Sequence, residues 1–536
     1  MMDYPLTIPS ILEHGARIFP KKEIISYLPD KSRHQYTFSD LHKRSKKLMH
    51  ALRHKLAVKK GDMIGTFAWN HYQHTELYFA VPGAGAVCHT INIRLSSSQT
   101  EFIINNAEDC YIFVDATLVS LLEPIASLLP TVEAYIILNA TSDFSTSLSN
   151  YIHYEDLISD CPDDSAWVEV SEHDASAMCF TSGTTGLPKG VLYSHRSVCL
   201  HSIIISLPNY VSISSSNKIL IIVPQFHVMA WGFPFAAILC GAALVLPSSL
   251  LQPDALIKMI IEENVDKAAG VPTIWQGIYA CLKKNGHTSI PLKELLVGGA
   301  SMPSSLIENY QKDFGIKAVH AWGMTETSPV ASVSRLQPEH DSLSNDEKIK
   351  RRALQGQQLP FTELRIVMEN GEVAAWDGKS VGEIQVRGAW VINDYFKTNN
   401  RESFSEDGWF KTGDVGAIND EGYLQITDRA KDLIKSGGEW ISSVALEVTI
   451  MAHPKVKEAA VIAIPDEIWT ERPLAVIVLK EEKDFVSDEE FRKFLSASFV
   501  KYQIPDKFIF RQEILKTSVG KFDKKRMRQL YAEGKL

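Results

Sequence analysis

The sequence predicts an α/β protein with a large N-terminal domain of layered α/β subdomains, which includes a small β-barrel-like part, and a smaller α+β C-terminal domain. The chain has 536 residues, more than the ~250–300 at which a single hydrophobic core stops growing. Up to about residue 330, apolar strand-like runs alternate with helical patterns, as in layered α/β structures. A charged segment at 427–432 then precedes a short, self-contained C-terminal unit.

The elements of the large domain are recognised from their periodicity. Leu41, Leu48 and Leu52 recur at helical spacing, with lysine and arginine around the rest of that segment, which predicts an amphipathic helix. Apolar runs bounded by turn residues predict buried strands. These runs lie at 111–114, 135–138, 177–180, 219–223 and 295–297. Short alternating runs at 363–387 predict a small barrel or a set of hairpins.

One long stretch, 219–253, lacks Asp, Glu, Lys and Arg. Its part from 228 to 246 is long enough to read as a membrane-spanning helix. Gly232, Pro234 and Gly241 interrupt it, however, and divide it into a helix at 234–240 and a strand at 242–246. We therefore expect a buried core element and no spanning helix, and leave peripheral membrane contact open.

The C-terminal unit has its own strands and helix. Apolar runs at 459–464 and 474–479 predict strands, and Ser487 followed by Glu490 is a capping-box pattern that begins a helix. We therefore expect an N-terminal domain at 1–428, a hinge at 429–432 and a C-terminal domain at 433–536.

Composition disfavours several classes of protein. The 55 Lys and Arg residues against 64 Asp and Glu leave a net charge of −9. A nucleic-acid binder usually carries a net positive charge. Seven cysteines lie far apart with no CxxC pair, which disfavours zinc and disulfide frameworks and favours a reducing compartment. The N-terminus lacks a signal-peptide pattern. We expect a cytoplasmic protein that does not bind nucleic acid.

A glycine- and hydroxyl-rich loop follows the apolar run at 177–180. It reads Thr181-Ser182-Gly183-Thr184-Thr185-Gly186-Leu187-Pro188-Lys189-Gly190. Glycines let backbone N–H groups crowd around an anion, hydroxyls add donors and lysine adds charge, which indicates phosphate binding. A Walker loop has Ser or Thr directly after Gly-Lys, whereas Pro188 and Gly190 flank the lysine here. The alternative is an ordinary surface turn.

This loop resembles the signature of acyl-adenylate-forming enzymes, which include acyl-CoA synthetases, firefly-type luciferases and peptide-synthetase adenylation domains. Further motifs occur in the family's order over nearly the whole chain. They lie at 224–227, 298–300, 322–327, 409–414, 428–432, 435–440 and 516–521. Residues 435–444 resemble bacterial medium- or long-chain fatty acyl-CoA synthetases most.

The resemblance implies a reaction in two halves. A carboxylate attacks the α-phosphate of ATP to give acyl-AMP and pyrophosphate, and the thiol of coenzyme A then gives acyl-CoA and AMP. Lys521 matches the family's adenylation lysine, which offsets charge where two anions meet. Glu326 matches its Mg²⁺ ligand, and Thr181 adds a hydroxyl contact.

The resemblance also assigns the nucleotide contacts. Asp414 would accept hydrogen bonds from both ribose hydroxyls, with Arg429 near the same sugar. Trp322 would stack on adenine, at a position where the family more often has tyrosine. Gly298, Gly299 and Ala300 would let adenine approach closely, and Gly323 and Thr325 belong to the same nucleotide site.

Phe226, His227 and Trp231 are the expected acyl pocket. His227 would orient the carboxylate, and Trp231 would close the tunnel until ATP binds. The segment offers no acid for a substrate ammonium, which disfavours amino acids because an unpaired buried charge is costly. A fatty acid or similar hydrophobic carboxylate is expected. An aryl or other hydrophobic acid, or transfer to a carrier-protein thiol, remains the alternative.

In the second half, the C-terminal domain is expected to swing about Lys431 so that the thiol reaches the same carbonyl carbon. Gly437 and Gly438 would then line the pantetheine tunnel, while Lys435, as a further catalytic residue, and Trp440 would lie near the nucleotide. Leu515 stands where the family commonly has proline. Resemblance to bacterial long-chain enzymes is also compatible with a homodimer.

Overall fold

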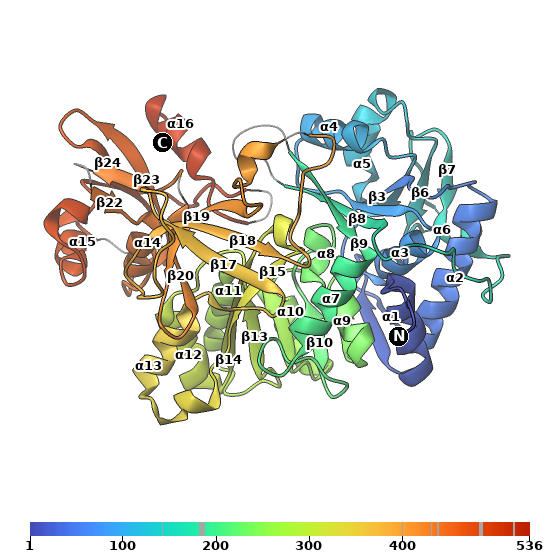
Figure 1. The fold of residues 1–536 in the computed structure, drawn as a ribbon, viewed down its shortest axis with the longest axis horizontal. Coiled ribbons are helices and arrows are strands. Elements are labelled where there is room, and N and C mark those ends of the chain that lie inside the picture. The colour runs from blue at the N-terminus through green and yellow to red at the C-terminus, as the bar shows by residue number, and fades with distance from the viewer. Residues whose placement is uncertain are drawn as a thin grey trace.

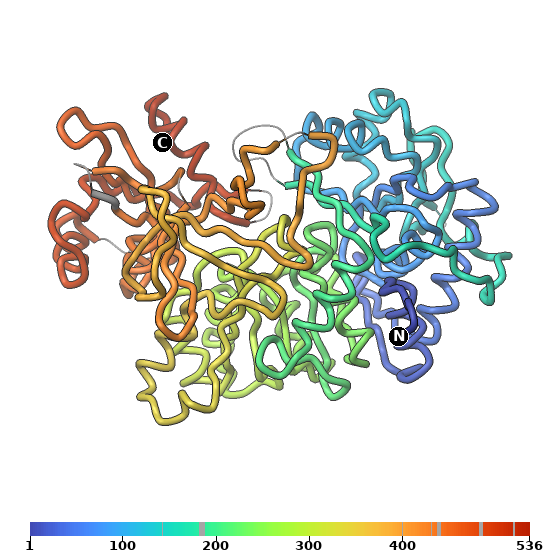
Figure 2. Tube along the Cα trace, viewed as in Figure 1, coloured from blue at the N-terminus to red at the C-terminus, as the bar shows by residue number. Residues whose placement is uncertain are grey.

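The computed structural model describes residues 1–141, 143–181, 188–398, 400–429, 431–436, 439–481, 486–517 and 520–536. Three sheets and the helices around them form the described part (Figure 1). The predicted α/β class, with a large N-terminal domain and a smaller C-terminal domain, is confirmed. In Figure 2 the trace runs from the N-terminal segments at one end to the C-terminal segments at the other.

The first sheet has seven strands in the order β7-β6-β5-β3-β4-β8-β9. Its strands are β3 (Met63–Phe67), β4 (Val87–Thr90), β5 (Tyr111–Asp115), β6 (Ala134–Leu138), β7 (Tyr151–His153), β8 (Ala175–Phe180) and β9 (Gly190–Ser194). All pair in parallel except β9, which returns antiparallel to β8. The adjoining helices are α2 (Phe38–His54), α3 (Tyr72–Gly83), α4 (Ser97–Ala107), α5 (Val119–Leu122) and α6 (Tyr154–Ile158).

Helix α2 shows why these segments fold as predicted. It begins at a capping box of Thr37 and Asp40, and Leu41, Leu48 and Leu52 are fully buried. The apolar face of the helix is therefore the core face, as its spacing predicted.

The second sheet has thirteen strands and joins a parallel half to an antiparallel half. Its order is β17-β18-β19-β20-β16-β15-β14-β13-β12-β10-β11-β1-β2. The first strands are β1 (Glu23–Tyr27), β2 (Arg33–Thr37), β10 (Lys218–Ile221), β11 (Ala243–Leu246), β12 (Lys267–Gly270), β13 (Glu294–Val297) and β14 (Lys317–Gly323). The others are β15 (Val330–Ser334), β16 (Gly356–Gln358), β17 (Thr362–Val367), β18 (Gly382–Gly388), β19 (Phe410–Ile418) and β20 (Tyr423–Arg429).

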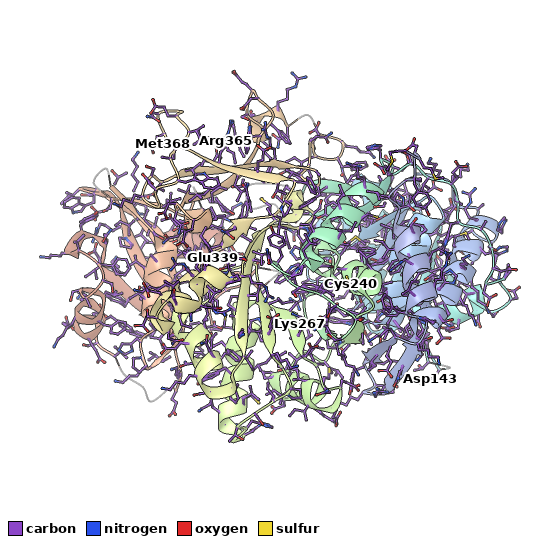
Figure 3. All side chains as sticks on the ribbon, turned by 60° about the horizontal axis from the view of Figure 1, so that its bottom comes forward. Asp143, Cys240, Lys267, Glu339, Arg365 and Met368 are labelled. Carbon is purple, nitrogen blue, oxygen red and sulfur yellow. The ribbon has the colours of Figure 1, made fainter. Side chains whose placement is uncertain are left out.

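The helices of this part are α1 (Ile8–Ile18), α7 (His195–Ser206), α8 (Val228–Trp231), α9 (Phe233–Cys240), α10 (Pro253–Glu262), α11 (Pro272–Lys284), α12 (Ser304–Phe314) and α13 (Asn345–Ala353). Strands β17 and β18 form an antiparallel hairpin where the runs at 363–387 predicted a small barrel or hairpins, and β19 and β20 continue it into a meander. Figure 3 labels Arg365 on β17 and Lys267 on β12. Lys267 and Arg335 both pair with Glu294, which ties neighbouring strands together inside the sheet.

The uncharged stretch forms buried core elements. Helix α9 and strand β11 occupy it, and nearly all of their side chains are buried. Within the described residues, every helix is too short or too polar to cross a bilayer. The stretch therefore packs inside the domain, as its glycine and proline breakers predicted.

The third sheet belongs to the C-terminal part, at the orange-to-red end of Figure 1. Its strands are β21 (Ile434–Ser436), β22 (Glu439–Ile441), β23 (Val456–Asp466), β24 (Thr470–Leu479) and β25 (Lys507–Phe510), and its helices are α14 (Ser443–Met451), α15 (Asp488–Leu495) and α16 (Lys524–Ala532). Ser487 caps α15 by accepting the Glu490 N–H at 3.2 Å, as predicted.

Candidate active site

A cavity of about 1010 Å³ lies between the carboxyl ends of the parallel strands and the C-terminal domain. Ile222, Val271, Gly298 and Trp322, which lie in or just after β10, β12, β13 and β14, line it. Lys521 lines it from the C-terminal side. The carboxyl ends of parallel strands are where open α/β sheets bind ligands, so this cavity is the candidate active site.

The two described ends of the predicted phosphate loop line this cavity. Strands β8 and β9 pair antiparallel up to Phe180 and Gly190. The Thr181 N–H donates to the Lys189 carbonyl at 2.9 Å, and the Lys189 N–H donates to Thr181 Oγ1 at 3.3 Å. Both residues line the cavity. The predicted phosphate contacts Ser182, Gly183, Thr184, Thr185 and Gly186 lie outside the described residues and stay predictions.

Glu326 lies in a 3₁₀ turn, Thr325–Thr327, with only 6% of its surface exposed. The Tyr395 hydroxyl donates to Glu326 Oε1 at 2.7 Å, and Lys189 Nζ lies 4.7 Å from the centre of the Tyr395 ring. Burial raises the pKa of Glu326. Among the described residues, this carboxylate forms no ion pair with a Lys or Arg, although the charge of Arg429 acts on it from farther away. A hard cation such as Mg²⁺, which prefers oxygen ligands, fits it.

The sequence did not predict Tyr395 as a residue of the site. It lies 69 residues from Glu326 along the chain, in a loop between β18 and β19. No spacing signal links the two residues, because only the fold brings that loop against the 3₁₀ turn.

Asp414 sits among the predicted nucleotide contacts and is 5% exposed. It pairs with Arg429 in the β19–β20 register, where Arg429 Nε lies 3.0 Å from Asp414 Oδ1. Trp322 Nε1 donates to Asp414 Oδ2 at 2.9 Å. The Asp414 charge raises the pKa of Arg429. One carboxylate oxygen thus accepts a hydrogen bond, and the other lies against a cation.

Two glycines permit close approach around this site. A Cβ on Gly323 would lie 1.7 Å from the Pro329 carbonyl oxygen, and one on Gly298 would lie 2.9 Å from the Trp231 ring. Neither position accepts a side chain unless its neighbours move. Gly299 and Ala300 also line the cavity.

Lys521 reaches the cavity from the C-terminal domain. A Cβ built on Gly299 would lie 3.8 Å from Lys521 Cε, so the side chain lies beside the predicted adenine loop. Burial, assisted by the positive charge of Arg429, lowers the pKa of Lys521 to about 8. The amine remains mostly protonated at neutral pH. The same cavity therefore holds this cation, Thr181 and Glu326.

His227 and Trp231 line the cavity as predicted for the acyl end, but Phe226 does not. Burial, together with the nearby charges of Lys521 and Arg94, lowers the pKa of His227 to about 3, so its imidazole is neutral. Phe226 is 2% exposed and packs in the core with Phe180. Residues 225–227 form a turn that the His227 N–H closes by donating to the Pro224 carbonyl at 3.1 Å, and within this turn Phe226 packs against the core instead of lining the cavity.

The segment that carries Trp231 has an unusual backbone. Residues Val228, Met229, Ala230 and Trp231 have φ of 47°, 49°, 52° and 57°, and Gly232 follows at 76°. Left-handed conformations cost roughly 1–2 kcal/mol for each non-glycine residue. The surrounding core, in which Val228, Met229 and Ala230 are buried, must hold this turn in place.

The remaining predicted residues lie on the C-terminal side. Lys431 lines the cavity, and burial lowers its pKa. Lys435 is exposed on β21, with its backbone N–H donating to Glu471, and is not among the cavity residues. Gly437, Gly438 and the Trp440 side chain lie outside the described part. Their predicted roles, and that of Lys435, stay predictions.

A cluster of buried polar residues spans the predicted hinge. This hinge cluster comprises Asp428, Ser443, Glu447 and Lys524. Asp428 Oδ2 accepts the Ser443 N–H at 2.6 Å and the Ser443 hydroxyl at 2.5 Å. Lys524 Nζ donates to Ser443 Oγ at 2.6 Å and pairs with Glu447 at 2.7 Å. Burial raises the pKa of Glu447 to about 7.

The hinge cluster was also missed at the level of sequence. From the sequence, residues 428–432 and 435–444 were recognised only as family motifs, without the contacts between them. The fold was needed to show that Asp428, before the hinge, meets Ser443 and Lys524 beyond it.

Comparisons with known proteins show the family of this chain. The AMP-binding enzyme model matches residues 12–396, and the AMP-binding enzyme C-terminal domain model matches 445–521. The chain is 42% identical over 533 residues to a long-chain-fatty-acid–CoA ligase of Thermus thermophilus, covering 99% of this chain and 96% of the relative. It is 42% identical over 534 residues to a medium-chain-fatty-acid–CoA ligase of Ectopseudomonas oleovorans, covering 99% and 97%.

Solved structures share the fold. The anthranilate CoA ligase AuaEII in complex with anthranoyl-AMP superposes with a TM-score of 0.88 at 22% identity, over 99% of both chains. An o-succinylbenzoate coenzyme A synthetase of Bacillus subtilis, solved with ATP and a magnesium ion, has a TM-score of 0.78 at 24% identity, over 98% of this chain and 99% of that one. With both family models matched in order along its length, the chain belongs to the AMP-binding enzyme family.

Proposed function

We propose that the protein is an AMP-forming, ATP-dependent fatty acid–CoA ligase. The observation that carries the proposal is that Lys521 shares one cavity with Thr181, Glu326 and Asp414, next to an apolar wall. That wall includes side chains of Ile222, Val228, Leu251, Ile274 and Leu306. The fatty-acid–CoA ligases that are 42% identical over 99% of this chain support the same reaction.

The arrangement suits the first half-reaction. Mg²⁺, held by Glu326 with Thr181 near the phosphates, would supply positive charge to the triphosphate. The Lys521 ammonium would offset the charge that develops where the fatty carboxylate attacks the α-phosphate. Asp414 would hold the ribose, and the neutral His227 would hydrogen-bond the carboxylate without forming an ion pair that must break. Each group acts through a fixed position in a largely buried site.

The second half-reaction requires a different pose of the C-terminal domain. Lys521 occupies the cavity in this structure, so the coenzyme A thiol would need it to withdraw. Rotation about Lys431 would supply that movement and bring residues 435–440 toward the nucleotide. Enclosure in either pose would also keep water from the reactive anhydride.

A substrate panel tests the proposal. The full chain with ATP, Mg²⁺, coenzyme A and aliphatic acids of increasing length should release AMP and acyl-CoA. Release of ADP would contradict the mechanism. Turnover of aryl acids alone, or transfer only to a carrier-protein thiol, would favour the alternatives left open by the sequence.

Two variants separate the half-reactions. Lys521→Ala should abolish most acyl-AMP formation yet retain thioester formation from supplied acyl-AMP. Lys431→Pro should do the reverse by holding the first pose. Lys507→Ala, which removes an exposed lysine of the same domain, should alter neither half. Cytoplasmic location and a homodimer remain predictions, which cell fractionation and light scattering test.

A further inference from the structure

The indole of Trp322 makes a contact that adenine stacking does not require. Its Nε1–H donates to Asp414 Oδ2 at 2.9 Å, and the two side chains are 7% and 5% exposed. We propose that Trp322 is a positioning residue, which orients the Asp414 carboxylate through this hydrogen bond and thereby gives the site its selectivity for ribonucleotides. The proposal rests on the proposed function, because it takes Asp414 as the ribose contact.

The backbone alone does not set this arrangement. Trp322 lies on β14 and Asp414 on β19, and strands β20, β16 and β15 separate them in the sheet. No ladder hydrogen bond therefore joins the two residues. Two side chains from different strands hold the carboxylate: Trp322 donates a hydrogen bond to Oδ2, and Arg429 forms an ion pair with Oδ1.

The number of acceptor sites matches the ligand. An ionised carboxylate has about four lone-pair sites, two on each oxygen. Trp322 occupies one site on Oδ2 by a hydrogen bond, and Arg429 lies 3.0 Å from Oδ1 as its ion-pair partner. One site on each oxygen is left, which suits the two neighbouring hydroxyls of a ribose. A 2′-deoxy or 3′-deoxy sugar would leave one of these buried acceptors without its partner.

An aromatic ring at position 322 is not enough to orient Asp414, because the orientation depends on the indole N–H. Phenylalanine keeps a flat ring for adenine but carries no donor. Without the indole N–H, only Arg429 would hold Asp414, and the terminal torsion of an aspartate is broad. The carboxylate would then present its acceptors to the sugar in many orientations.

Paired substitutions separate the two roles of Trp322. Trp322→Phe keeps an aromatic face and removes the donor. Trp322→His removes most of the face, but its Nε2 takes the place of the indole nitrogen in the five-membered ring. Trp167→Phe is the matched control, since Trp167 Nε1 donates to Glu13 Oε1 at 2.8 Å, outside the cavity.

The measurement is calorimetric binding of AMP, 2′-deoxy-AMP and 3′-deoxy-AMP to the full chain. We expect the unmodified protein and Trp167→Phe to bind AMP about tenfold more tightly than either deoxynucleotide. Trp322→Phe should lose most of that preference by weakening AMP selectively. Trp322→His should bind all three less tightly but keep the preference.

An equal loss for AMP and both deoxynucleotides in Trp322→Phe would overturn the proposal and leave stacking as the only role of the ring. Loss of the preference in Trp322→His would overturn it as well. This binding assay contains neither acid nor coenzyme A. Failure of the acid panel would therefore refute the proposed ligase activity without deciding the role of Trp322.

Discussion

The Asp428 carboxylate joins the two sides of the predicted hinge, and Asp428→Asn should loosen the pose seen here. The change keeps the size of the side chain but removes its negative charge. The charged carboxylate accepts hydrogen bonds from the Ser443 N–H at 2.6 Å and from the Ser443 hydroxyl at 2.5 Å. Asp428 is only 1% exposed, so water does not screen these bonds.

The magnitude follows from those two bonds. Hydrogen bonds to charged groups contribute about 1.5–3 kcal/mol and neutral ones about 0.5–1.5 kcal/mol, so each bond should lose about 1 kcal/mol. The N-terminus of α14 loses a nearby anion as well, which is worth about 0.3–1 kcal/mol. A total of about 2.5 kcal/mol corresponds to roughly a 60-fold change in the equilibrium between poses.

The assay measures the half-reactions separately, as pyrophosphate release and as thioester formation from supplied acyl-AMP. The ratio of the thioester rate to the adenylation rate should rise by up to about 60-fold in Asp428→Asn. Asp506→Asn is the control, because its pair with Arg472, 2.6 Å away, lies within the C-terminal domain. An unchanged ratio in Asp428→Asn, or an equal change in the control, would refute the role of the hinge cluster.

Three further predictions concern single residues. Because burial lowers the pKa of Lys521 to about 8, kcat/KM for pyrophosphate release should fall about tenfold per pH unit above pH 8. The Lys521→Arg variant, whose guanidinium stays charged, should not show this fall at alkaline pH. A fall shared by both proteins would contradict the assignment. Tyr395→Phe removes the donor to Glu326 and should weaken binding of Mg²⁺·ATP about tenfold by calorimetry, whereas unchanged affinity would exclude that role. Thr470→Gly removes the backbone strain of a β-branched residue at φ 69° and should raise the free energy of unfolding by about 1 kcal/mol in denaturant titrations. A decrease would show that contacts of the threonine side chain outweigh this strain.

Local patterns in the sequence predicted the α/β class, and the family motifs named part of the residues that line the cavity. Helical spacing placed Leu41 and Leu52 in the core, and breakers within 219–253 distinguished a buried helix and strand from a membrane span. The family motifs pointed to Lys521 and Asp414, which the structure brings to one cavity. The helix and strand signals succeed because they depend on residues close together in the chain.

The tertiary structure alone decided which distant groups meet and how their environment changes them. In the folded chain, Phe226 packs in the core, and burial lowers the pKa of His227 so that its imidazole is neutral. The Tyr395 hydroxyl donates to Glu326, and the Trp322 indole donates to Asp414. A pKa depends on burial and on charges that neighbouring elements supply. Side-chain hydrogen bonds between strands that are not adjacent depend on the curvature of the whole sheet, which no short stretch of sequence encodes.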